Sequence, residues 1–357
     1  MPGRIVDVPI SPERRRQLVV VAAGFSLVLT CVLLETISLL LNHLGYVHVA
    51  PLEDSQDDPI GPQRFDPELG WALRPGFYPE DEKTLVNRMG FRSSTEFDFS
   101  APRSGKRRAL LLGDSMIFGL GVPQEFIASE VINRESPRWE AVNTGVIAYS
   151  TAQEYVIQKK YSPLMKPDAA VLFFTEINDL WWNSRTSGPS AGFSIEGDKL
   201  IYHAPRRDNH VPLYLRTTFG RLVDQTLLQG KDFTFLKDRL SFELWPERSR
   251  VWVVTRRLLI EMKKVADEHH YPLIIVDIPT QRQLRNASAN RAQPLLARLS
   301  AELGVTYIDL LHYYPRDPFR LYLENDSHWN AEGHRFIAQL LRSVLEGAGV
   351  TPSLTNP

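Results

Sequence analysis

The sequence predicts an α/β protein in which helices cover both faces of a central parallel sheet. From residue 105 onward, short apolar segments alternate with amphipathic stretches of helical length, and this alternation is typical of βαβ units. The apolar runs at 170–174 and 273–278 do not alternate between apolar and polar residues, which is expected of strands buried on both faces. We therefore expect a flavodoxin-like three-layer sandwich with a central sheet of about five strands.

The expected elements follow one another along the chain. The predicted strands are 109–113, 139–143, 169–174, 272–278 and 305–310. The predicted helices are 123–135, 151–164, 248–268, 291–303 and 331–347, and the last of these closes the domain.

The composition excludes several classes of protein. The 357 residues include 41 basic and 42 acidic side chains, and this balance argues against a nucleic-acid binder, which carries a basic excess. The single cysteine, Cys31, rules out an intramolecular disulfide and a cysteine-based metal site. The pair His269-His270 has no further ligand at a useful spacing. We expect no metal and no cofactor.

An apolar segment near the N-terminus predicts a transmembrane helix at 18–41. It contains 24 residues with one charge, Glu35, which suffices to cross a bilayer core of about 20 residues. The apolar region of a cleaved signal peptide is shorter, roughly 7–15 residues. Arginines precede the segment and acidic residues follow it, at 53–58. The positive-inside rule then places residues 1–17 in the cytoplasm and the chain after residue 41 outside it.

The remainder divides by composition. Residues 42–67 are rich in proline and acidic side chains and suit an extended linker. Residues 68–104 form a turn-rich lead-in that we expect to pack on the domain as an edge strand and loop. The folded domain spans 105–350, and a short tail, 351–357, ends the chain.

An insertion at 183–245 interrupts the alternation of strands and helices. It predicts a hairpin around 195–200, followed by helical segments that carry many aromatic residues. These aromatics could cap the site and stack on sugar rings, or they could form a small satellite core. Aromatic residues at helical spacing are more often core, which favours the second interpretation. The aromatics concerned include Tyr214, Phe219, Phe233, Phe235 and Trp245.

Polar residues follow three of the predicted strands. Ser115 comes after 109–113, Gly145 after 139–143 and Asn178 after 169–174. Because the carboxyl ends of parallel strands meet at one edge, where such sheets bind ligands, we expect these residues to converge. The chain has no Gly-x-Ser-x-Gly elbow, which argues against an α/β-hydrolase lipase.

A base for a serine nucleophile is available downstream. Acyl transfer through serine needs an imidazole within hydrogen-bond reach and a carboxylate that holds this imidazole in the correct tautomer. Asp326 and His328 lie together just before the last predicted helix and fit these two requirements. Asn325 is an alternative orienting group, and we expect His334 to lie on a helix surface.

Taken in order, these blocks resemble the SGNH, or GDSL-type, hydrolase family over residues 105–345. The blocks are Gly113-Asp114-Ser115, Asn143-Thr144-Gly145, Asn178-Asp179 and Asp326-Ser327-His328-Trp329. The resemblance implies the SGNH hydrolase fold, with Ser115 as nucleophile and His328 as general base. It further implies an oxyanion hole made by the N–H groups of Ser115 and Gly145 and the amide of Asn178. In this interpretation, supporting roles fall to Asp114 and Asp179, which secure loops, and to Trp329.

At two positions the sequence departs from the common family pattern. The aspartate stands two residues before the histidine rather than three, and Glu176 occupies a position where the family often has glycine. The Asp-x-His-Trp spacing is similar to that of SGNH proteins of polysaccharide O-acetylation, including those of alginate. This variant implies carbohydrate esters as substrates, with lipid esters and thioesters as open alternatives. It also implies a partner in the polysaccharide machinery of a bacterial envelope, with the anchor in the inner membrane.

Two hypotheses of function follow. The first is a membrane-anchored, extracytoplasmic serine esterase or O-acyltransferase that forms an acyl-enzyme on Ser115. The second is a catalytically silent glycan-binding or scaffolding module on the same fold, which fold alone does not exclude. The intact set of serine, glycine, asparagine, aspartate and histidine favours the first, because a binding module needs no nucleophile–base pair.

Overall fold

A computed structural model describes most of the chain. The described residues are 11–44, 62–79, 83–97, 105–186, 188–206, 217, 219, 233–286, 291–324 and 326–347. The chain forms two compact units, one made of Met1–Asp54 with Asn209–Thr234 and the other of Ser55–Asp208 with Phe235–Pro357. Most of the expected cytoplasmic N-terminus, most of the expected linker, the tail and Tyr214 lie outside the described residues.

The first unit contains the helix α1, Pro12–His43. Ser11 caps it by accepting a hydrogen bond from the Arg14 N–H, and Pro12 starts it at a position where a missing N–H costs nothing. Its 32 residues span about 48 Å at 1.5 Å per residue, more than a hydrocarbon core of about 30 Å. Among the described residues this is the one helix long and apolar enough to cross a membrane, and a signal sequence would share these properties.

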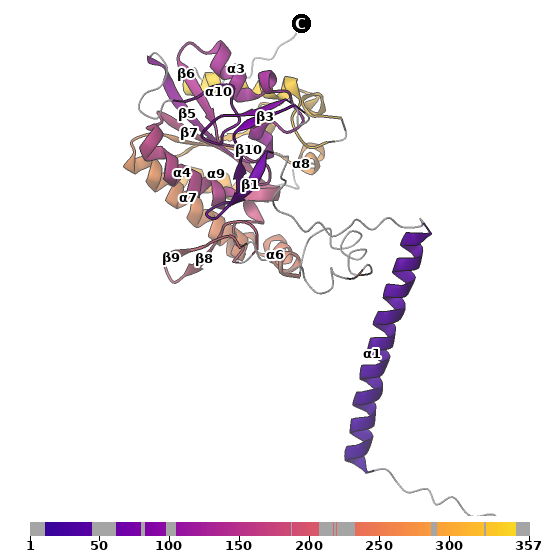
Figure 1. The fold of residues 1–357 in the computed structure, drawn as a ribbon. Coiled ribbons are helices and arrows are strands. Elements are labelled where there is room, and N and C mark those ends of the chain that lie inside the picture. The colour runs from indigo at the N-terminus through magenta and orange to yellow at the C-terminus, as the bar shows by residue number, and fades with distance from the viewer. Residues whose placement is uncertain are drawn as a thin grey trace, which may run out of the picture. The chain divides into compact units, whose positions relative to one another are not determined.

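The second unit is built around a parallel sheet of five strands (Figure 1). The strands are β5 (Arg107–Leu112), β6 (Trp139–Asn143), β7 (Ala169–Thr175), β10 (Leu273–Ile278) and β11 (Thr306–Asp309). Their order across the sheet is β11-β10-β7-β5-β6, and every neighbouring pair is parallel. This is the strand order of a flavodoxin-like doubly wound sheet, so the predicted fold class is confirmed.

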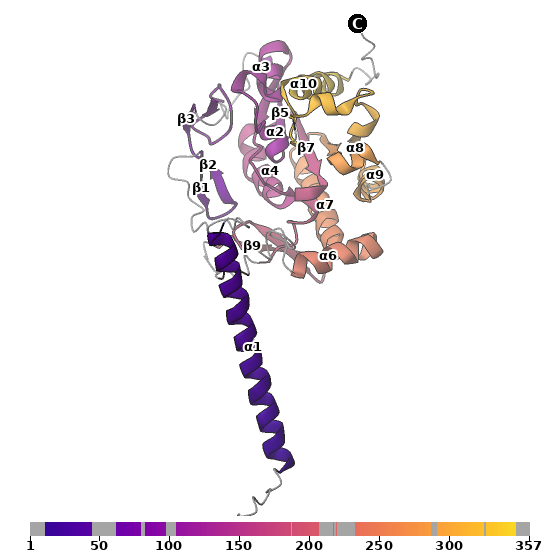
Figure 2. The same cartoon turned by 90° about the vertical axis from the view of Figure 1, so that its right-hand side faces the viewer.

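Helices cover both faces of this sheet (Figure 2). On one face lie α3 (Ala128–Glu135) and α10 (Ala331–Leu345), and on the other lie α4 (Thr151–Met165), α7 (Arg250–Glu268) and α9 (Ala292–Leu303). Successive residues of β5 serve the two layers in turn, since Leu110 and Leu112 pack toward α4 and α7, whereas Ala109 and Leu111 pack toward α3 and α10.

The predicted helix 123–135 is shorter than expected. The segment begins with a 3₁₀ turn, η2 (Gln124–Phe126), and α3 starts only at Ala128. Between them Ile127 has extended backbone angles, φ −66° and ψ 149°, and its side chain is fully buried. Burial of this isoleucine therefore accompanies a break that the amphipathic pattern does not reveal.

The lead-in forms two small hairpins that add buried side chains to the domain. β1 (Gln63–Asp66) pairs with β2 (Gly70–Leu73), and β3 (Gly76–Tyr78) pairs with β4 (Thr84–Val86). β1 lies within the segment 42–67, which we expected to be an extended linker. Its residues are held in the hairpin by pairing with β2, for example Phe65 with Trp71. Leu73 and Phe91 are buried in the core on the α4 face.

The insertion contributes a hairpin and a helix to the second unit. β8 (Gly192–Glu196) and β9 (Lys199–His203) pair across a two-residue turn, and α6 spans Phe233–Leu244. Phe193 is buried and Phe242 packs edge-on against Trp181, with ring centroids 5.5 Å apart, whereas Trp245 is 60% exposed. The described aromatics thus include both core and surface residues.

Candidate active site

The serine follows the carboxyl end of a central strand. β5 ends at Leu112, and after one turn the short helix α2 (Ser115–Phe118) begins. Asp114 caps this helix, because its carboxylate accepts the Met116 N–H at 2.8 Å. The turn thereby fixes Ser115 at the edge of the sheet, where its side chain is 7% exposed.

Glycines allow the neighbouring loops to approach this turn. Gly119 ends α2 in the left-handed region, with φ of 92°, where a Cβ is strained. Gly145 follows β6, and a Cβ at this position would lie 2.5 Å from a methyl group of Ile117 and 2.8 Å from the Phe118 nitrogen. A larger residue at 145 would push the second loop away from α2.

The imidazole stands between the serine and a carboxylate. His328 Nε2 lies 2.7 Å from Ser115 Oγ, and His328 Nδ1 lies 2.5 Å from Asp326 Oδ1. The same carboxylate oxygen accepts the His328 backbone N–H at 2.9 Å. A carboxylate at Nδ1 keeps the proton there and leaves Nε2 as an acceptor for the serine hydroxyl.

The charge state of Asp326 suits this arrangement. Partial burial acts to raise the pKa of Asp326, but the hydrogen bonds from the His328 N–H and ring, together with the charge of that ring, outweigh it, so the net pKa is lowered. The group is therefore ionised at neutral pH. Asn325, the alternative orienting residue, lies outside the described part of the chain.

Residues after the histidine hold its loop against the domain. Trp329 is fully buried, donates its indole N–H to the Tyr314 hydroxyl at 3.1 Å, and packs edge-on against Phe173 of β7. Asn330 caps α10 through the Gly333 N–H and donates its amide to the carbonyls of residues 320 and 322. Together these two residues fix the end of the loop that carries His328.

The three expected oxyanion donors differ in what they contact. The Ser115 N–H is the first of α2, so it has no acceptor within the helix. The Asn178 amide lies on the turn η3 (Glu176–Leu180) and gives one hydrogen to Asp114 Oδ2 at 2.6 Å, which leaves its second hydrogen for a ligand. The Gly145 N–H instead donates to Asn143 Oδ1 at 3.0 Å, so an oxyanion would have to compete with that side chain.

A cavity of about 470 Å³ opens over the serine. Its walls come from all the strand ends that surround Ser115, and include Leu120, Ile147, Ala148, Thr175, Ile177, Asn178, Ile278, Pro279, Thr280, Gln281, Arg282, Ser327 and His328. Glu176, which replaces the expected glycine, directs its carboxylate to the Gln283 amide at 2.7 Å on α8 (Gln281–Arg285). The walls are mainly apolar, and such walls suit an acyl group.

Three buried carboxyl groups lie next to one another here: Asp114 in the cavity wall, and Asp179 and Glu154, which do not line the cavity. Asp179 accepts the Thr175 N–H at 2.5 Å and the Thr151 hydroxyl at 2.9 Å, which holds η3 between β7 and α4. Glu154 is equally buried, and among the described residues no donor reaches its carboxyl oxygens. Burial first, and then the charges of Asp179 and Asp114, raise the pKa of Glu154 well above its usual range. Glu154 is thus a neutral acid beside the two aspartates, a feature the sequence did not reveal.

Arg92, from the lead-in, is a second residue that sequence reasoning missed. Its guanidinium is fully buried and donates to the carbonyl oxygens of Phe118, Gly119 and Val122, at 3.2, 2.7 and 2.7 Å. It also donates to Gln124 Oε1 at 3.1 Å. These bonds hold the loop that follows α2 in place. Arg92 belongs to the turn-rich stretch 87–92, whose glycine and turn residues predict an edge segment but no buried charge.

The expectation that His334 lies on a helix surface is wrong. Its side chain is completely buried, its Nδ1 accepts the Ala128 N–H at 3.2 Å, and its ring lies edge-on to Trp329. Burial, reinforced by the charges of Arg92 and His328, lowers the pKa of His334 to about 3, so the ring is neutral. His334 therefore serves the packing between α3 and α10.

Comparisons with known proteins identify similar folds. No family model matches the chain, and no curated protein does. Among solved structures, a member of the lipolytic protein G-D-S-L family from Veillonella parvula has 14% identity and a TM-score of 0.39, over 69% of this chain and all of its own. A lipase/acylhydrolase from Enterococcus faecalis has 14% identity and a TM-score of 0.39, over 68% of this chain and 96% of its own. A psychrotrophic esterase from Pseudoalteromonas has 10% identity and a TM-score of 0.38, over 68% and 98%. TM-scores this low assign no function to this chain.

Proposed function

We propose that this protein is a serine esterase or O-acyltransferase that works through an acyl-enzyme on Ser115. The observation that carries the proposal is the continuous hydrogen-bonded line from Ser115 Oγ through the His328 ring to Asp326, with separations of 2.7 and 2.5 Å. These distances fall within the range, about 2.6–3.2 Å, that a base needs to take the serine proton, or just below it. The line ends inside an open cavity with space for an acyl ester.

The chemistry follows from this geometry. As Ser115 Oγ attacks the ester carbonyl, its proton moves to His328 Nε2, and Asp326 stabilises the imidazolium. The carbonyl electron pair becomes an oxyanion, to which the Ser115 N–H and the free Asn178 hydrogen donate. Collapse of this intermediate breaks the bond to the alcohol, which leaves with the proton from Nε2. An acyl group then remains on Ser115.

The second half-reaction decides between the two activities. Either water or a sugar hydroxyl gives its proton to His328 and attacks the acyl-enzyme. Release of the acyl group to water is hydrolysis, and release to the sugar is transfer. We assign carbohydrate esters as the substrate class, with the Asp-x-His-Trp spacing of residues 326–329 as support.

The experiment uses the full-length chain in detergent or nanodiscs with p-nitrophenyl acetate. We expect release of p-nitrophenol and a transient acetyl mass on the peptide that contains Ser115. Both signals should disappear in Ser115→Ala and in His328→Ala. Addition of neutral and acidic oligosaccharides as acceptors then separates transfer from hydrolysis by the mass of the sugar product. A folded wild-type protein that gives neither turnover nor adduct, also with longer acyl esters, would favour the silent binding module.

We further propose that α1 anchors the protein in a bacterial inner membrane with the catalytic unit outside the cytoplasm. Support comes from the length of α1 and from Arg14, Arg15 and Arg16 at its start, on the side that the positive-inside rule assigns to the cytoplasm. Trypsin added to intact spheroplasts should digest the catalytic unit, whereas protection of the unit until lysis would contradict this orientation. Sedimentation of the unit with membranes distinguishes a retained anchor from a cleaved signal.

A further inference from the structure

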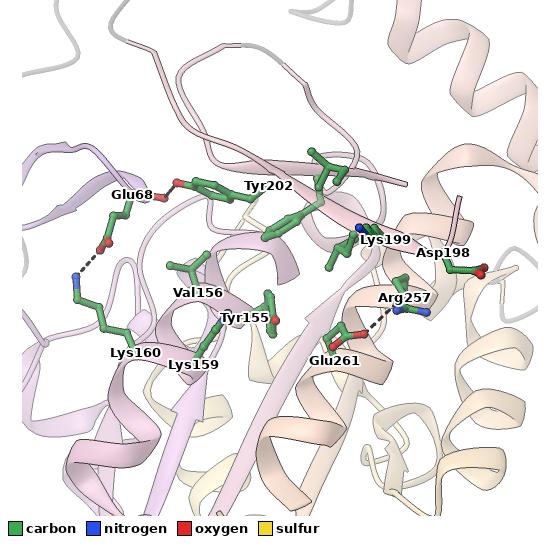
Figure 3. A pocket seen from close by; sticks show the side chains of 13 residues that line it. Glu68, Tyr155, Val156, Lys159, Lys160, Asp198, Lys199, Tyr202, Arg257 and Glu261 are labelled. Carbon is green, nitrogen blue, oxygen red and sulfur yellow. Dashed lines mark hydrogen bonds and ion pairs between the residues drawn. The ribbon is translucent and has the colours of Figure 1, made fainter. Parts of the chain in front are cut away.

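A second cavity, larger than the catalytic one, lies on the α4 and α7 side of the second unit. Its volume is about 770 Å³, and its walls come from the hairpin β8–β9, from α4 and α7, and from Glu68 of the lead-in (Figure 3). It shares no lining residue with the cavity above Ser115. The groove under the hairpin, as we call it, is therefore a separate site rather than an extension of the catalytic cavity.

Aromatic rings form the middle of the groove. Tyr155 of α4 and Phe193 of β8 meet with ring centroids 5.8 Å apart, and Phe193 meets Tyr202 of β9 at 5.4 Å. Tyr202 remains 40% exposed, and its hydroxyl donates to the Glu68 carbonyl at 2.7 Å, which fixes the ring in place. A fixed and partly exposed aromatic ring offers a flat apolar face at little entropic cost.

Basic side chains stand on both sides of these rings. In Figure 3, Lys159 and Lys160 of α4 lie on one side of Tyr155, and Lys199 and Arg257 lie on the other. Lys160 pairs with Glu68, and Arg257 pairs with Glu261 at 3.0 Å. Within the described residues, no carboxylate lies within ion-pair distance of Lys159 or Lys199, and Asp198 at the hairpin turn likewise has no basic partner. Two ammonium groups and one carboxylate are thus available to a ligand.

This distribution favours one class of ligand. An anionic amphiphile has its charge at one end and needs cations there alone, together with a long apolar tunnel. In this groove cations lie at both ends, and the apolar lining combines the three aromatic rings with the aliphatic side chains of Val156, Leu200 and Ile201. A chain of sugar rings with a carboxylate on successive rings matches it, since ring faces stack on aromatics, carboxylates pair with lysines, and hydroxyls donate to Asp198.

We propose that the groove under the hairpin binds an acidic oligosaccharide through Tyr202, Lys159 and Lys199, at a distance from the catalytic serine. The inference deepens the proposed function, on whose carbohydrate substrate it rests, by naming that carbohydrate as an acidic polymer. The groove would hold one stretch of the polymer while another stretch enters the cavity at Ser115.

The test is isothermal titration calorimetry of the full-length chain in nanodiscs with a hexamer of galacturonic acid as the probe. Maltohexaose serves as the neutral probe and dodecyl phosphate as the amphiphilic one. We expect binding of the hexagalacturonate alone. Equal binding of maltohexaose would overturn the role of charge, and binding of dodecyl phosphate without hexagalacturonate would overturn the assignment of a glycan. Absence of all binding by the folded protein would overturn the site itself.

Matched variants localise the binding. Lys159→Ala with Lys199→Ala should weaken hexagalacturonate binding roughly tenfold or more, because each lysine loses a charge-assisted contact. Lys159→Arg with Lys199→Arg should restore it. Lys237→Ala with Lys263→Ala removes the same charge elsewhere on the second unit and should change affinity less than about twofold. Equal losses in the two alanine pairs would show a general charge effect and overturn the groove.

A further variant separates this inference from the proposed function. Ser115→Ala should bind hexagalacturonate as the wild type does while it releases no p-nitrophenol. If the wild type binds the glycan but does not turn over the ester, the proposed function fails and the groove stands. If it turns over the ester but binds no hexagalacturonate, the groove fails and the serine mechanism stands.

Discussion

The two loops that carry Ser115 and His328 are built differently. Residues 113–118, around Ser115, are all buried, and Arg92 binds the chain that follows them through four hydrogen bonds. In the loop of His328, the Asp326 side chain is 46% exposed, and the main attachments are Trp329 and Asn330 behind the histidine. The serine side is thus fixed by a buried charge, and the histidine side by a buried indole with one capping amide.

The comparison shows where the site has freedom to move. Hydrogen bonds to a buried guanidinium resist displacement, because breaking them leaves several unsatisfied groups in a low-dielectric interior. A partly exposed aspartate can exchange its partners for water at little cost. We infer that the oxyanion side is preorganised, whereas the base side adjusts when a substrate fills the cavity.

The largest expected effect is loss of either reacting group. Ser115→Ala and His328→Ala should each lower kcat for p-nitrophenyl acetate by roughly 10⁴-fold or more, and the double variant should be no worse, because the two residues act as a unit. Steady-state kinetics of the three variants would measure this. If their effects multiplied, the two loops would be working independently.

The second prediction compares the loss of stability when Arg92, near the serine loop, or Arg320, near the histidine loop, is replaced. Arg92→Met should destabilise the second unit by about 3–5 kcal/mol, since it leaves three buried carbonyl oxygens and Gln124 Oε1 without the donors that Arg92 supplies. Arg320→Met, beside the histidine loop, removes an exposed ion pair with Glu332 and should cost less than about 0.5 kcal/mol.

Urea unfolding followed by tryptophan fluorescence would give both values. Similar costs for the two arginines would contradict the difference between the loops. Arg92→Lys is informative as well, because it keeps the charge but cannot reach all four acceptors, and we expect it to fall between the wild type and Arg92→Met.

The third effect concerns the oxyanion side alone. Asn178→Ala should reduce kcat about 100–1,000-fold, with little change in KM, because it removes a donor that acts in the transition state. It also removes the hydrogen bond to Asp114. Asn143→Ala frees the Gly145 N–H. A kcat above that of the wild type, after correction for the fraction of the variant that is folded, would show that this N–H joins the oxyanion hole. A decrease would show that Asn143 acts mainly by holding the loop.

The smallest effect depends on pH and involves the strand between the two loops. Burial raises the pKa of Asp277 on β10 to about 7, although the Tyr307 hydroxyl donates to it and acts in the opposite direction. In the unfolded chain the pKa is near 4, so between about pH 4 and pH 7 the folded state holds the proton more tightly. The stability from this group is therefore complete below pH 4 and is lost as the pH rises to about 7.

Asp277→Asn removes this dependence. We expect the variant to gain roughly 2–3 kcal/mol over the wild type between pH 5 and pH 8. Unfolding curves at the two pH values would measure the gain. A constant difference between variant and wild type across this range would show that Asp277 does not titrate there.

Much of the fold was predictable because it depends on patterns of burial. All five strands start and end within two residues of their predicted limits, since runs such as Leu273–Ile278 have no polar face. The convergence of Ser115 and Asn178 follows from the parallel topology, which brings strand ends to one edge. This convergence depends only on where the strands end, and not on how far Ser115 and Asn178 lie from His328 in the sequence.

What the sequence did not predict concerns buried polar groups. Arg92, Glu154 and His334 are side chains normally placed on surfaces, and nothing in a linear pattern states that partners will surround them. Likewise, the hydrogen bond from the Gly145 N–H to Asn143 depends on a rotamer, and the break at Ile127 depends on packing between α3 and the sheet. Such features arise from tertiary contacts between distant segments, so local sequence carries little sign of them.

The hydrogen bond between Ser115 and His328 joins residues 213 positions apart, and this has a consequence for biosynthesis. Because Ser115 leaves the ribosome long before His328, the serine has no imidazole partner during most of its synthesis. Under the proposed function, completion of the domain is therefore the step that first makes acyl transfer possible. A chain arrested before residue 328 would carry the serine without its base.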